Sequence, residues 1–582
     1  MGYNTTSSAQ TFIFQHIAQA GGVLVAASLI FATIYAVAEG LTRVAFVNHL
    51  RLWDMWRPAA AASPEVSGRV IGGFVWTGFF LLYAVVFYWF STRVLGWWQP
   101  ADIHSDPNIL ASWRPALAPI FTALQAGTWE ECLFRAIPLS LAVLIGTHYG
   151  IRNKLVIATL ILQALIFAGA HANYPNLPGY SRLIELFIPA MVFGVVYLRF
   201  GLMVCMLAHF EYDLVLMSLP IFIAEDSSLW IDRALVISAG CAPLFAVIWT
   251  RWRRGALTAL GDEFRNSSVT PVLPSPEPVE TAQEQQALLP AIRLNRVTLM
   301  LIGLVSIALM IAAAVKPPRI DWEPYRFQID RHQAQHNADR VLREQGVELK
   351  GEWRRTTTTH TSWSQPLEYV WRESGASKVQ ELIGKYLDTP FWVITWRKFD
   401  GPVEERSEYW QVWLYPDGRL HELVHSLPEG RAGAKLTREQ AVAKAQAWIT
   451  AKQWSDLNQL EEKSVEEILR PARNDWVVTY LDKNAYHHNN ASAAIVIKIA
   501  GDEITSYVRT VDIPEEWKRA ENEEHSRQQP YKIVGMVAML LLFGSAALSF
   551  FRKQMAPKFS VRAAWPWVGI VVTGQLLVFL LW

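Results

Sequence analysis

Two adjacent carboxylates, Glu130 and Glu131, lie with Arg135 in the otherwise apolar segment Ala116–Ile145. A charge at bilayer depth costs about 2.5–3.5 kcal/mol on insertion scales, so such residues normally face a bundle interior or a wet cavity. Glu131 and Arg135 are four residues apart, so on a helix they share a face and can neutralise each other. Glu130 lies about 100° further round the helix. It therefore has no partner on its own helix and is free to meet water.

Two histidines lie in later apolar segments. His171 follows Phe167 by one helical turn, and His209 precedes Asp213 by one turn, so each pair shares a helix face. A single membrane histidine usually only bonds to a neighbouring helix, and a Glu–Arg pair can be structural. Two imidazoles and an unpaired carboxylate on three segments would cost several kcal/mol unless they meet in a polar cavity.

Such a set is suited to hydrolysis. A carboxylate beside a neutral imidazole can take a proton from water, and a second imidazole can stabilise a developing oxyanion. Glu130, His171 and His209 are also an acceptable set of zinc ligands, with a fourth position open for water. Neither route needs a Ser or Cys nucleophile, so we expect Cys132, which follows the two carboxylates, only to pack.

The ordered motifs Glu-Glu-x-x-x-Arg, Phe-x-x-x-His and His-x-x-x-Asp resemble those of the CPBP intramembrane proteases. This is the CAAX-prenyl endopeptidase and bacteriocin-processing group, also called the ABI family, and the resemblance covers about residues 110–224. It implies that Glu130 and His171 activate water and that His209 stabilises the oxyanion. It also implies structural support of the site by Glu131, Arg135 and Phe167.

Position 213 departs from that family, which usually has Asn there, whereas this chain has Asp. An ionised Asp213 cannot donate a hydrogen bond to an oxyanion. It could instead hold His209 protonated or bind a metal. The substitution leaves both a metal-free and a zinc-assisted mechanism open.

The elements that must position these residues are membrane-spanning helices. Hydrophobic residues make up 52% of the 582 and charged residues only 18%, which is typical of a membrane protein with a soluble part. Apolar segments long enough to span, or nearly so, lie at Thr11–Ala38, Val70–Trp89, Ala116–Ile145, Leu155–Ala172, Leu183–Leu198, Leu202–Ala224, Ala234–Thr250, Val297–Val315, Tyr531–Phe551 and Ala563–Trp582.

The sequence predicts a multi-span α-helical membrane bundle with an inserted soluble α+β domain. The expected parts are an N-terminal transmembrane bundle (1–254) with a protease-like core (about 110–224), a largely disordered cytoplasmic linker rich in Pro, Glu and Gln (255–295), a transmembrane helix (296–315), an extracytoplasmic domain (316–530) and two C-terminal transmembrane helices (531–582).

Basic residues set the expected topology. They follow the first, third, fifth and seventh segments and precede the last, at Arg43, Arg51, Arg57, Arg69, Arg152, Lys154, Arg199, Arg251, Arg253, Arg254, Arg552, Lys553, Lys558 and Arg562. Such loops lie in the cytoplasm by the positive-inside rule. We therefore expect a multi-pass protein of the plasma (cytoplasmic) membrane, with the N-terminus and residues 316–530 extracytoplasmic.

The soluble region contains a weak internal duplication. Each half has a helix, at 329–344 and after Thr437, which forms a capping box with Gln440. Alternating apolar residues then predict strands at Phe391–Trp396, Tyr409–Tyr415, Arg419–His425, Trp476–Tyr480, Ala494–Ile499 and Glu503–Arg509. A helix followed by an antiparallel sheet, twice over, resembles two PepSY-like modules.

A second motif, His421-Glu422-Leu-Val-His425, spells the HExxH signature of zinc proteases. That signature works only on a helix, where both histidines share a face beside the glutamate. Here it follows Tyr-Pro-Asp-Gly, a turn signal that starts a strand. We therefore assign this motif no metal.

The sequence thus favours an intramembrane endopeptidase acting on a peptide or membrane-protein substrate in or near the lipid bilayer. The outer region would recognise substrate or regulate cleavage. The formal net charge of +1 gives no field to attract nucleic acid. One alternative is a non-proteolytic membrane sensor or scaffold whose outer domain binds a ligand or protein, and another is a proton-coupled transporter. Separations beyond about 8 Å among Glu130, His171 and His209 would exceed the reach of one water or metal and favour the sensor.

Overall fold

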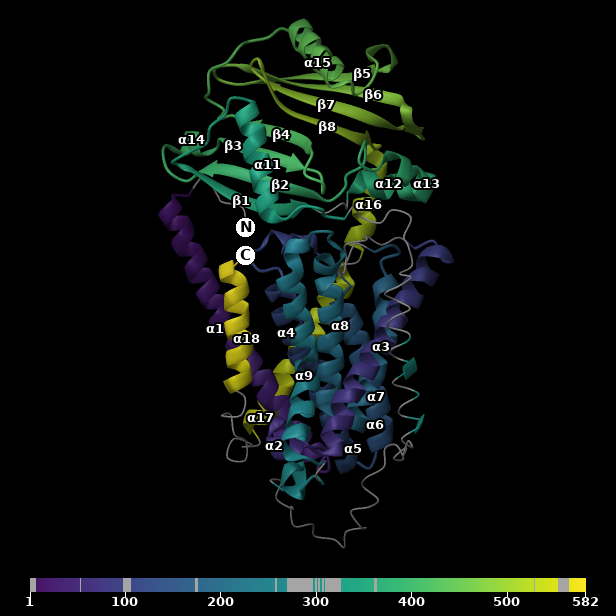
Figure 1. Cartoon of the computed structure of the whole chain (residues 1–582). Helices are drawn as coiled ribbons and strands as arrows, with labels where there is room; N and C mark the ends of the chain where they lie inside the picture. Colours follow the sequence, from purple (N-terminus) through teal and green to yellow (C-terminus); the bar gives the residue numbers. More distant parts are fainter. Residues whose placement is uncertain are drawn as a thin grey trace.

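The computed structural model describes residues 7–52, 54–97, 106–172, 176–256, 259–268, 326–360, 364–527, 529–552 and 565–581, with a few positions between 297 and 308. A helical bundle carries an α+β domain on one end (Figure 1). The fold class predicted from the sequence is therefore confirmed.

Seven helical segments in the described part of the chain are long and apolar enough to cross a membrane. They are Ala9–Ala45 (α1), Pro64–Arg93 (α3), Leu117–His148 (α4 and α5), Arg152–Ala170 (α6), Ser181–Phe200 (α7), Leu202–Ile223 (α8) and Ser227–Arg254, which contains α9 (Trp230–Arg254). Each overlaps one of the first seven predicted segments. The chain is a multi-pass membrane protein.

The third span is not one regular helix. It consists of α4 (Leu117–Glu130), a π-helical turn (Glu131–Ala136) and α5 (Ile137–His148). A π-helical turn rotates the side chains after it relative to a regular helix, and such turns are frequent at functional sites. Here the turn begins between the two adjacent carboxylates, and all of its residues are buried.

A glycine brings two backbones of the bundle together next to the carboxylates. A Cβ on Gly127 of α4 would lie 2.8 Å from the backbone nitrogen of Phe210 and 2.9 Å from the carbonyl oxygen of Met206, both on α8. Only a residue without a side chain fits there. Gly127 thereby sets the distance between the end of α4, which bears Glu130, and α8, which bears His209.

Two C-terminal helices flank the bundle, α17 (Gln529–Arg552) and α18 (Trp565–Leu581). They lie within the predicted C-terminal segments, give or take a few residues. A Cβ on Gly535 of α17 would lie 2.7 Å from the backbone nitrogen of Ala170, the last residue of α6. Helix α18 packs against α4 and α1.

The outer domain contains two four-stranded antiparallel sheets, each with its strands in sequence order. The first consists of β1 (Trp353–His360), β2 (Phe391–Lys398), β3 (Tyr409–Leu414) and β4 (Leu420–Ser426). The second consists of β5 (Glu461–Leu469), β6 (Asn474–His488), β7 (Ala491–Ala500) and β8 (Glu503–Asp512). Helix α11 (Arg331–Glu344) precedes the first sheet and α15 (Arg438–Lys452) the second, so the predicted order of a helix followed by an antiparallel sheet occurs twice.

Other elements of this domain were not predicted. Besides β1 and β5, these are α12 (Gln365–Ser374), α13 (Ala376–Leu382), α14 (Val403–Arg406) and α16 (Glu515–Ser526). Strand β4 contacts β8, where Glu422 Oε1 accepts hydrogen bonds from Ser506 Oγ (2.6 Å) and the Tyr507 backbone nitrogen (3.1 Å). The HExxH sequence therefore lies on a strand, as predicted.

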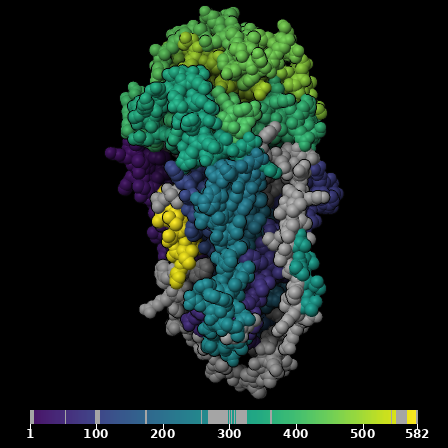
Figure 2. All heavy atoms as spheres, in the orientation of Figure 1, coloured from purple at the N-terminus to yellow at the C-terminus, as the bar shows by residue number. Residues whose placement is uncertain are grey.

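The outer domain sits directly on one end of the bundle (Figures 1 and 2). The Thr359 backbone nitrogen of β1 donates to Asn108 Oδ1 (2.9 Å), and Arg331 of α11 stacks over Trp113 (4.4 Å to the ring centroid). The guanidinium of Arg406 donates to the carbonyl oxygen of Ser7, at the start of α1. The beginning of α1 and the outer domain therefore lie at the same end of the bundle, as the predicted topology requires.

The predicted linker (255–295) and the predicted helix at 296–315 lie mostly outside the described residues. Residues 259–268, at the start of that linker, are packed rather than disordered. The side-chain amide of Asn266 donates to the Phe46 carbonyl oxygen (2.9 Å), and Arg265 Nη2 lies 2.9 Å from Glu65 Oε1. Phe264 is buried, and these anchors explain why this stretch departs from the prediction.

Candidate active site

Three helices bring the four predicted reactive side chains together. Glu130 ends α4, His171 follows the last residue of α6, and His209 and Asp213 share one face of α8. Glu130 Oε2 lies 3.8 Å from His171 Nε2 and 3.9 Å from His209 Nε2. These distances lie well within the reach of one water, so the separation that would have favoured a sensor is not observed.

Glu131 has two partners rather than the one predicted. Its Oε1 lies 3.3 Å from Arg135 Nη1, and it also accepts a hydrogen bond from His209 Nδ1 (2.8 Å). The π-helical turn lets Glu131 face α8 while Glu130 faces the neighbouring space. Glu131 therefore orients His209 in addition to pairing with Arg135.

Arg135 is fully buried between aromatic rings. Its guanidinium carbon lies 4.2 Å from the centroid of Phe167 and 5.2 Å from that of Phe193. Cation–π contact with desolvated rings is worth about 2 kcal/mol, which helps to offset burial of the charge. This is a direct structural role for Phe167, one of the predicted supporting residues.

His171 is held in one tautomer. Its Nδ1 lies 2.8 Å from the Phe167 carbonyl oxygen, which can only accept, so Nδ1 carries the proton. Nε2 of the neutral ring then presents a lone pair towards Glu130. That lone pair can accept a proton from a water held between the two side chains.

His209 lies between two carboxylates. Nδ1 faces Glu131, and Nε2 lies 3.3 Å from Asp213 Oδ2. A doubly protonated imidazole satisfies both acceptors, because each ring nitrogen then donates. The arrangement fits the predicted role of Asp213 as a group that keeps His209 protonated.

These side chains line a cavity of about 350 Å³. Its remaining wall combines aromatic and aliphatic residues with a few polar groups, including Thr122, Gln125 and Tyr212. Mostly apolar walls with a few converging polar groups are typical of ligand sites, and the volume falls within their usual range. The cavity can hold part of an extended peptide chain.

A second polar group in this cavity wall was not predicted from the sequence. Arg182 and Glu185 of α7 both line it and are buried, with Arg182 Nη1 2.5 Å from Glu185 Oε1. The Tyr88 hydroxyl donates to the same carboxylate oxygen (2.5 Å), and the Tyr83 hydroxyl donates to the Glu185 backbone carbonyl (2.8 Å). The i,i+3 spacing of Arg182 and Glu185 at the start of an apolar segment was the available signal.

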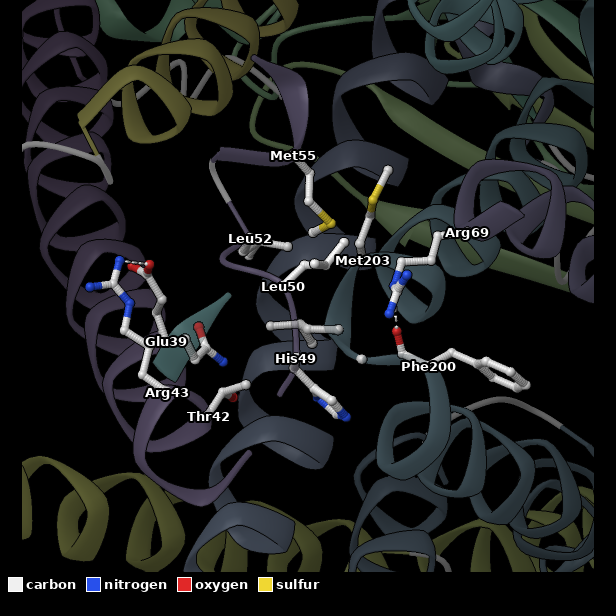
Figure 3. A pocket seen from close by; sticks show the side chains of 13 residues that line it. Glu39, Thr42, Arg43, His49, Leu50, Leu52, Met55, Arg69, Phe200 and Met203 are labelled. Atoms are coloured by element: carbon white, nitrogen blue, oxygen red, sulfur yellow. Dashed lines mark hydrogen bonds and ion pairs between the residues drawn. The ribbon is translucent and has the colours of Figure 1, made fainter. Parts of the chain in front are cut away.

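A much smaller cavity, of about 20 Å³, lies among the ends of α1, α3, α7 and α8 (Figure 3). It has room for about one water. Its carboxylate, Glu39, is paired with Arg43, and Arg69 Nε donates to the Phe200 carbonyl oxygen (3.1 Å). The contacts around this second cavity join the helix ends, and the cavity is too small to hold a substrate.

The donor set of Glu130, His171 and His209 is chemically suited to zinc, and both Nδ1 atoms are held by outer acceptors, as in many zinc sites. The three ligand atoms nevertheless do not all lie within 4.8 Å of one another. Among the described residues, one set of three His, Cys, Asp or Glu ligands has all its ligand atoms within 4.8 Å of one another, and it is a different set: Glu368, Glu521 and His525.

Comparison with known families identifies part of the chain. Residues 112–215 match the family model of type II CAAX prenyl endopeptidase Rce1-like proteins. The matched range contains Glu130, His171, His209 and Asp213, so it supports the CAAX-protease part of the predicted resemblance. No curated protein and no solved structure matches the chain. The PepSY-like resemblance of the outer domain stays a prediction.

Proposed function

We propose that this chain is an intramembrane endopeptidase in which Glu130 and His171 activate water for peptide-bond hydrolysis. The observation that carries the proposal is the convergence of Glu130 Oε2 with two histidine Nε2 atoms, at 3.8 and 3.9 Å, on the wall of a 350 Å³ cavity. The family match over residues 112–215 supports the same reaction class.

In the first step, a water between Glu130 and His171 loses a proton to the Glu130 carboxylate as its oxygen attacks the scissile carbonyl carbon. His171 accepts the second water proton as a hydrogen bond at Nε2 and so orients the attack. The gap of 3.8 Å between the two side chains is too long for a direct hydrogen bond and suits one bridging water.

In the second step, the tetrahedral oxyanion is stabilised by the charge of the His209 imidazolium and by its Nε2 N–H, which it shares with Asp213. Asp213 and Glu131 keep that imidazole charged and oriented. The C–N bond then breaks as Glu130 returns its proton to the leaving amine, which yields a carboxylic acid and an amine and restores the carboxylate.

A zinc ion held by Glu130, His171 and His209 would, when bound, act as a Lewis acid on the water. Zinc would need a deprotonated Nε2 on His209, which would then be a ligand instead of the oxyanion donor, while the Nδ1 contacts of both histidines would stay as they are. Glu130 would be the base in the metal-free version and a ligand in the zinc-assisted one, and its removal is expected to impair water activation in both.

We place the outer domain and the N-terminus on the extracytoplasmic face of the plasma membrane, in agreement with the basic loops at the other end of the bundle. The domain lies on one end of the bundle (Figure 1), and Leu177, a few residues after His171, is buried in the same cluster as Leu367 and Tyr369 of the outer domain. In this position it can restrict or guide the approach of a peptide or membrane-protein substrate.

The test is cleavage of a library of labelled membrane-peptide substrates by the purified protein in lipid vesicles. Glu130→Gln and His171→Ala are each expected to reduce initial rates by about 10²–10⁴-fold. The matched control is Glu211→Gln, which removes a buried carboxylate on α8 that faces Gly240 of α9 instead of the cavity. Full activity in both site variants would overturn the proposal.

A further inference from the structure

The outer domain contains a second Glu–His cluster that the proposed reaction does not use. Glu368 lies on α12, and Glu521 and His525 lie one turn apart on α16. Each offers one ligand atom, and the three atoms lie within 4.8 Å of one another. The two helices are far apart in sequence, so their meeting point is made by the fold rather than by a local turn.

Both carboxylates are buried: Glu368 is 0% exposed and Glu521 is 4% exposed. The cluster already contains one positively charged side chain, because Arg372 contacts Glu521 Oε2 and lies 3.4 Å from Glu368 Oε1. Of the two remaining oxygens, Glu521 Oε1 faces His525 Nε2, whereas Glu368 Oε2 is buried without a hydrogen-bond partner. Buried polar oxygens normally have one, so Glu368 Oε2 points to a missing ligand.

His525 completes the arrangement. Its Nε2 lies 3.0 Å from Glu521 Oε1, close to the separation of roughly 3.3 Å expected between ligand atoms around a tetrahedral zinc ion. The imidazole is 28% exposed, which leaves an entry path from solvent. One imidazole, two carboxylates and an open side for water form a donor set that zinc accepts.

We propose that Glu368, Glu521 and His525 bind a divalent cation of the zinc class and thereby clamp α16 to α12. The cation takes the oxygens that Arg372 leaves unbonded, while Arg372 keeps the other two. Its guanidinium stays against Trp517, 5.4 Å from the ring centroid.

The clamp has a direct path to the membrane site. Helix α17 begins three residues after α16 ends, and its Gly535 packs against Ala170, next to His171. A cation that fixes α16 therefore fixes the outer end of the helix that supports α6. This consequence rests on the proposed function, whereas cation binding itself does not.

The test is zinc binding by the full-length protein in detergent, after chelation and buffer exchange, in competition with a chromophoric indicator. Measurement in the Glu130→Gln/His171→Ala background removes any contribution from the membrane site. We expect one zinc equivalent there, and binding at least 10-fold weaker after adding Glu521→Gln or His525→Ala. The matched controls are Glu523→Gln, an exposed residue of α16 paired with Arg527, and His336→Ala, an exposed residue of α11.

A variant that keeps a ligand separates metal binding from folding. His525→Cys offers a thiolate, so it is expected to bind Cd²⁺ with a sulfur-to-metal charge-transfer band that His525→Ala lacks. Absence of zinc in the folded background protein would overturn the proposal. If Glu521→Gln and His525→Ala bound zinc as tightly as the background protein, that result would overturn the proposal as well. Proteolysis is not the readout, so failure here is distinguishable from failure of the proposed enzyme activity.

Discussion

The chain carries two sets of histidine and glutamate that look catalytic in sequence, one in the membrane bundle and one on strand β4. In the bundle, Glu130 meets two histidines from other helices across a cavity. On β4 the pairing register shifts at His421, so the two histidines do not share a face: His421 stacks on Phe391 and His425 on Trp410, and these two rings lie on opposite faces of the sheet. The HExxH motif on β4 matches a known protease signature at every position, yet its geometry excludes zinc-dependent hydrolysis.

The charges of the outer set are already neutralised. His425 Nδ1 lies 2.6 Å from Glu503 Oε1, and its Nε2 lies 3.0 Å from Glu408 Oε1. Glu408 is also paired with Lys398 (3.2 Å) and Arg431 (2.8 Å). Every partner is satisfied within the protein, so this network stabilises the fold and leaves no group for a substrate.

In the bundle, the nearby arginine is paired with Glu131 and not with Glu130. Arg135 pairs with Glu131 and stacks on aromatic rings, and among the described residues no lysine or arginine forms an ion pair with Glu130. The comparison supports the proposal that Glu130, the carboxylate left without a permanent cation and facing a cavity, is the reactive one.

The largest expected effect comes from giving Glu130 such a cation. Ala126 lies one turn before Glu130 and lines the same cavity, so Ala126→Arg places a guanidinium beside the carboxylate. An ion pair there would occupy the base, and we expect peptide cleavage to fall by about 10²-fold or more. Ala126→Gln adds a similar bulk without charge, and the ratio of the two rates in one assay isolates the charge. Equal rates would show that a free Glu130 is not the distinguishing feature.

A smaller loss is expected from Glu131→Gln, which weakens the hydrogen bond that orients His209 and the pair with Arg135. Outer partners of a reactive histidine are typically worth 10–100-fold in activity, so kcat should fall by about that amount with KM nearly unchanged. Glu211→Gln on α8 is the control. A purely structural role for Glu131 would instead reduce the yield of folded protein and leave kcat per folded molecule intact.

In the outer set, the expected change is in stability rather than activity. Burial would raise the pKa of Glu408, but hydrogen bonds from His425 and Lys398 and the charge of Arg431 outweigh burial and hold that pKa at about 2. A lowered carboxyl pKa adds stability that is present above about pH 4.5 and is lost as the pH falls towards 2. Burial would lower the pKa of His425, yet Glu408 and Glu503 raise it, so its contribution is present below about 6.5 and lost at higher pH.

The whole network therefore stabilises most between about pH 4.5 and 6.5. Thermal unfolding of the full chain in detergent, followed through the outer-domain tryptophans, measures this window. Glu408→Gln is expected to lower stability by about 1.5–3 kcal/mol there and to flatten the decline on the acid side. If the stability of the variant fell at low pH as steeply as that of the parent, the decline could not be assigned to Glu408.

Much of this arrangement follows from the sequence because its causes are local. Long apolar runs predicted the seven spans, and one-turn spacings predicted which of Glu131, Arg135, His209 and Asp213 share a face. The convergence of three helices could be inferred only from the energetic cost of leaving Glu130, His171 and His209 apart.

Other features depend on packing between distant segments. The π-helical turn at Glu131 has no sequence signature, and it decides that both carboxylates of the pair reach the site. From the sequence alone, Arg182 and Glu185 look like an ion pair at the membrane interface. Only the fold shows that Tyr88 of α3 also bonds to Glu185. Strand β1 carries a threonine run with flanking arginines and only a partly buried face, so its alternation was too weak to read.

The smallest expected effect tests the discounted motif directly. In a strand, the Cα atoms of His421 and His425 are separated by about 13 Å, too far for one metal ion to bind both side chains. His421 is instead stacked on Phe391, at 4.2 Å between ring centroids. We expect His421→Ala to leave peptide cleavage within twofold of the parent and to leave the zinc content unchanged. A loss of either, in protein whose thermal unfolding remains cooperative, would mean that β4 contributes to the chemistry and that a free carboxylate beside a cavity is not what separates the two sets.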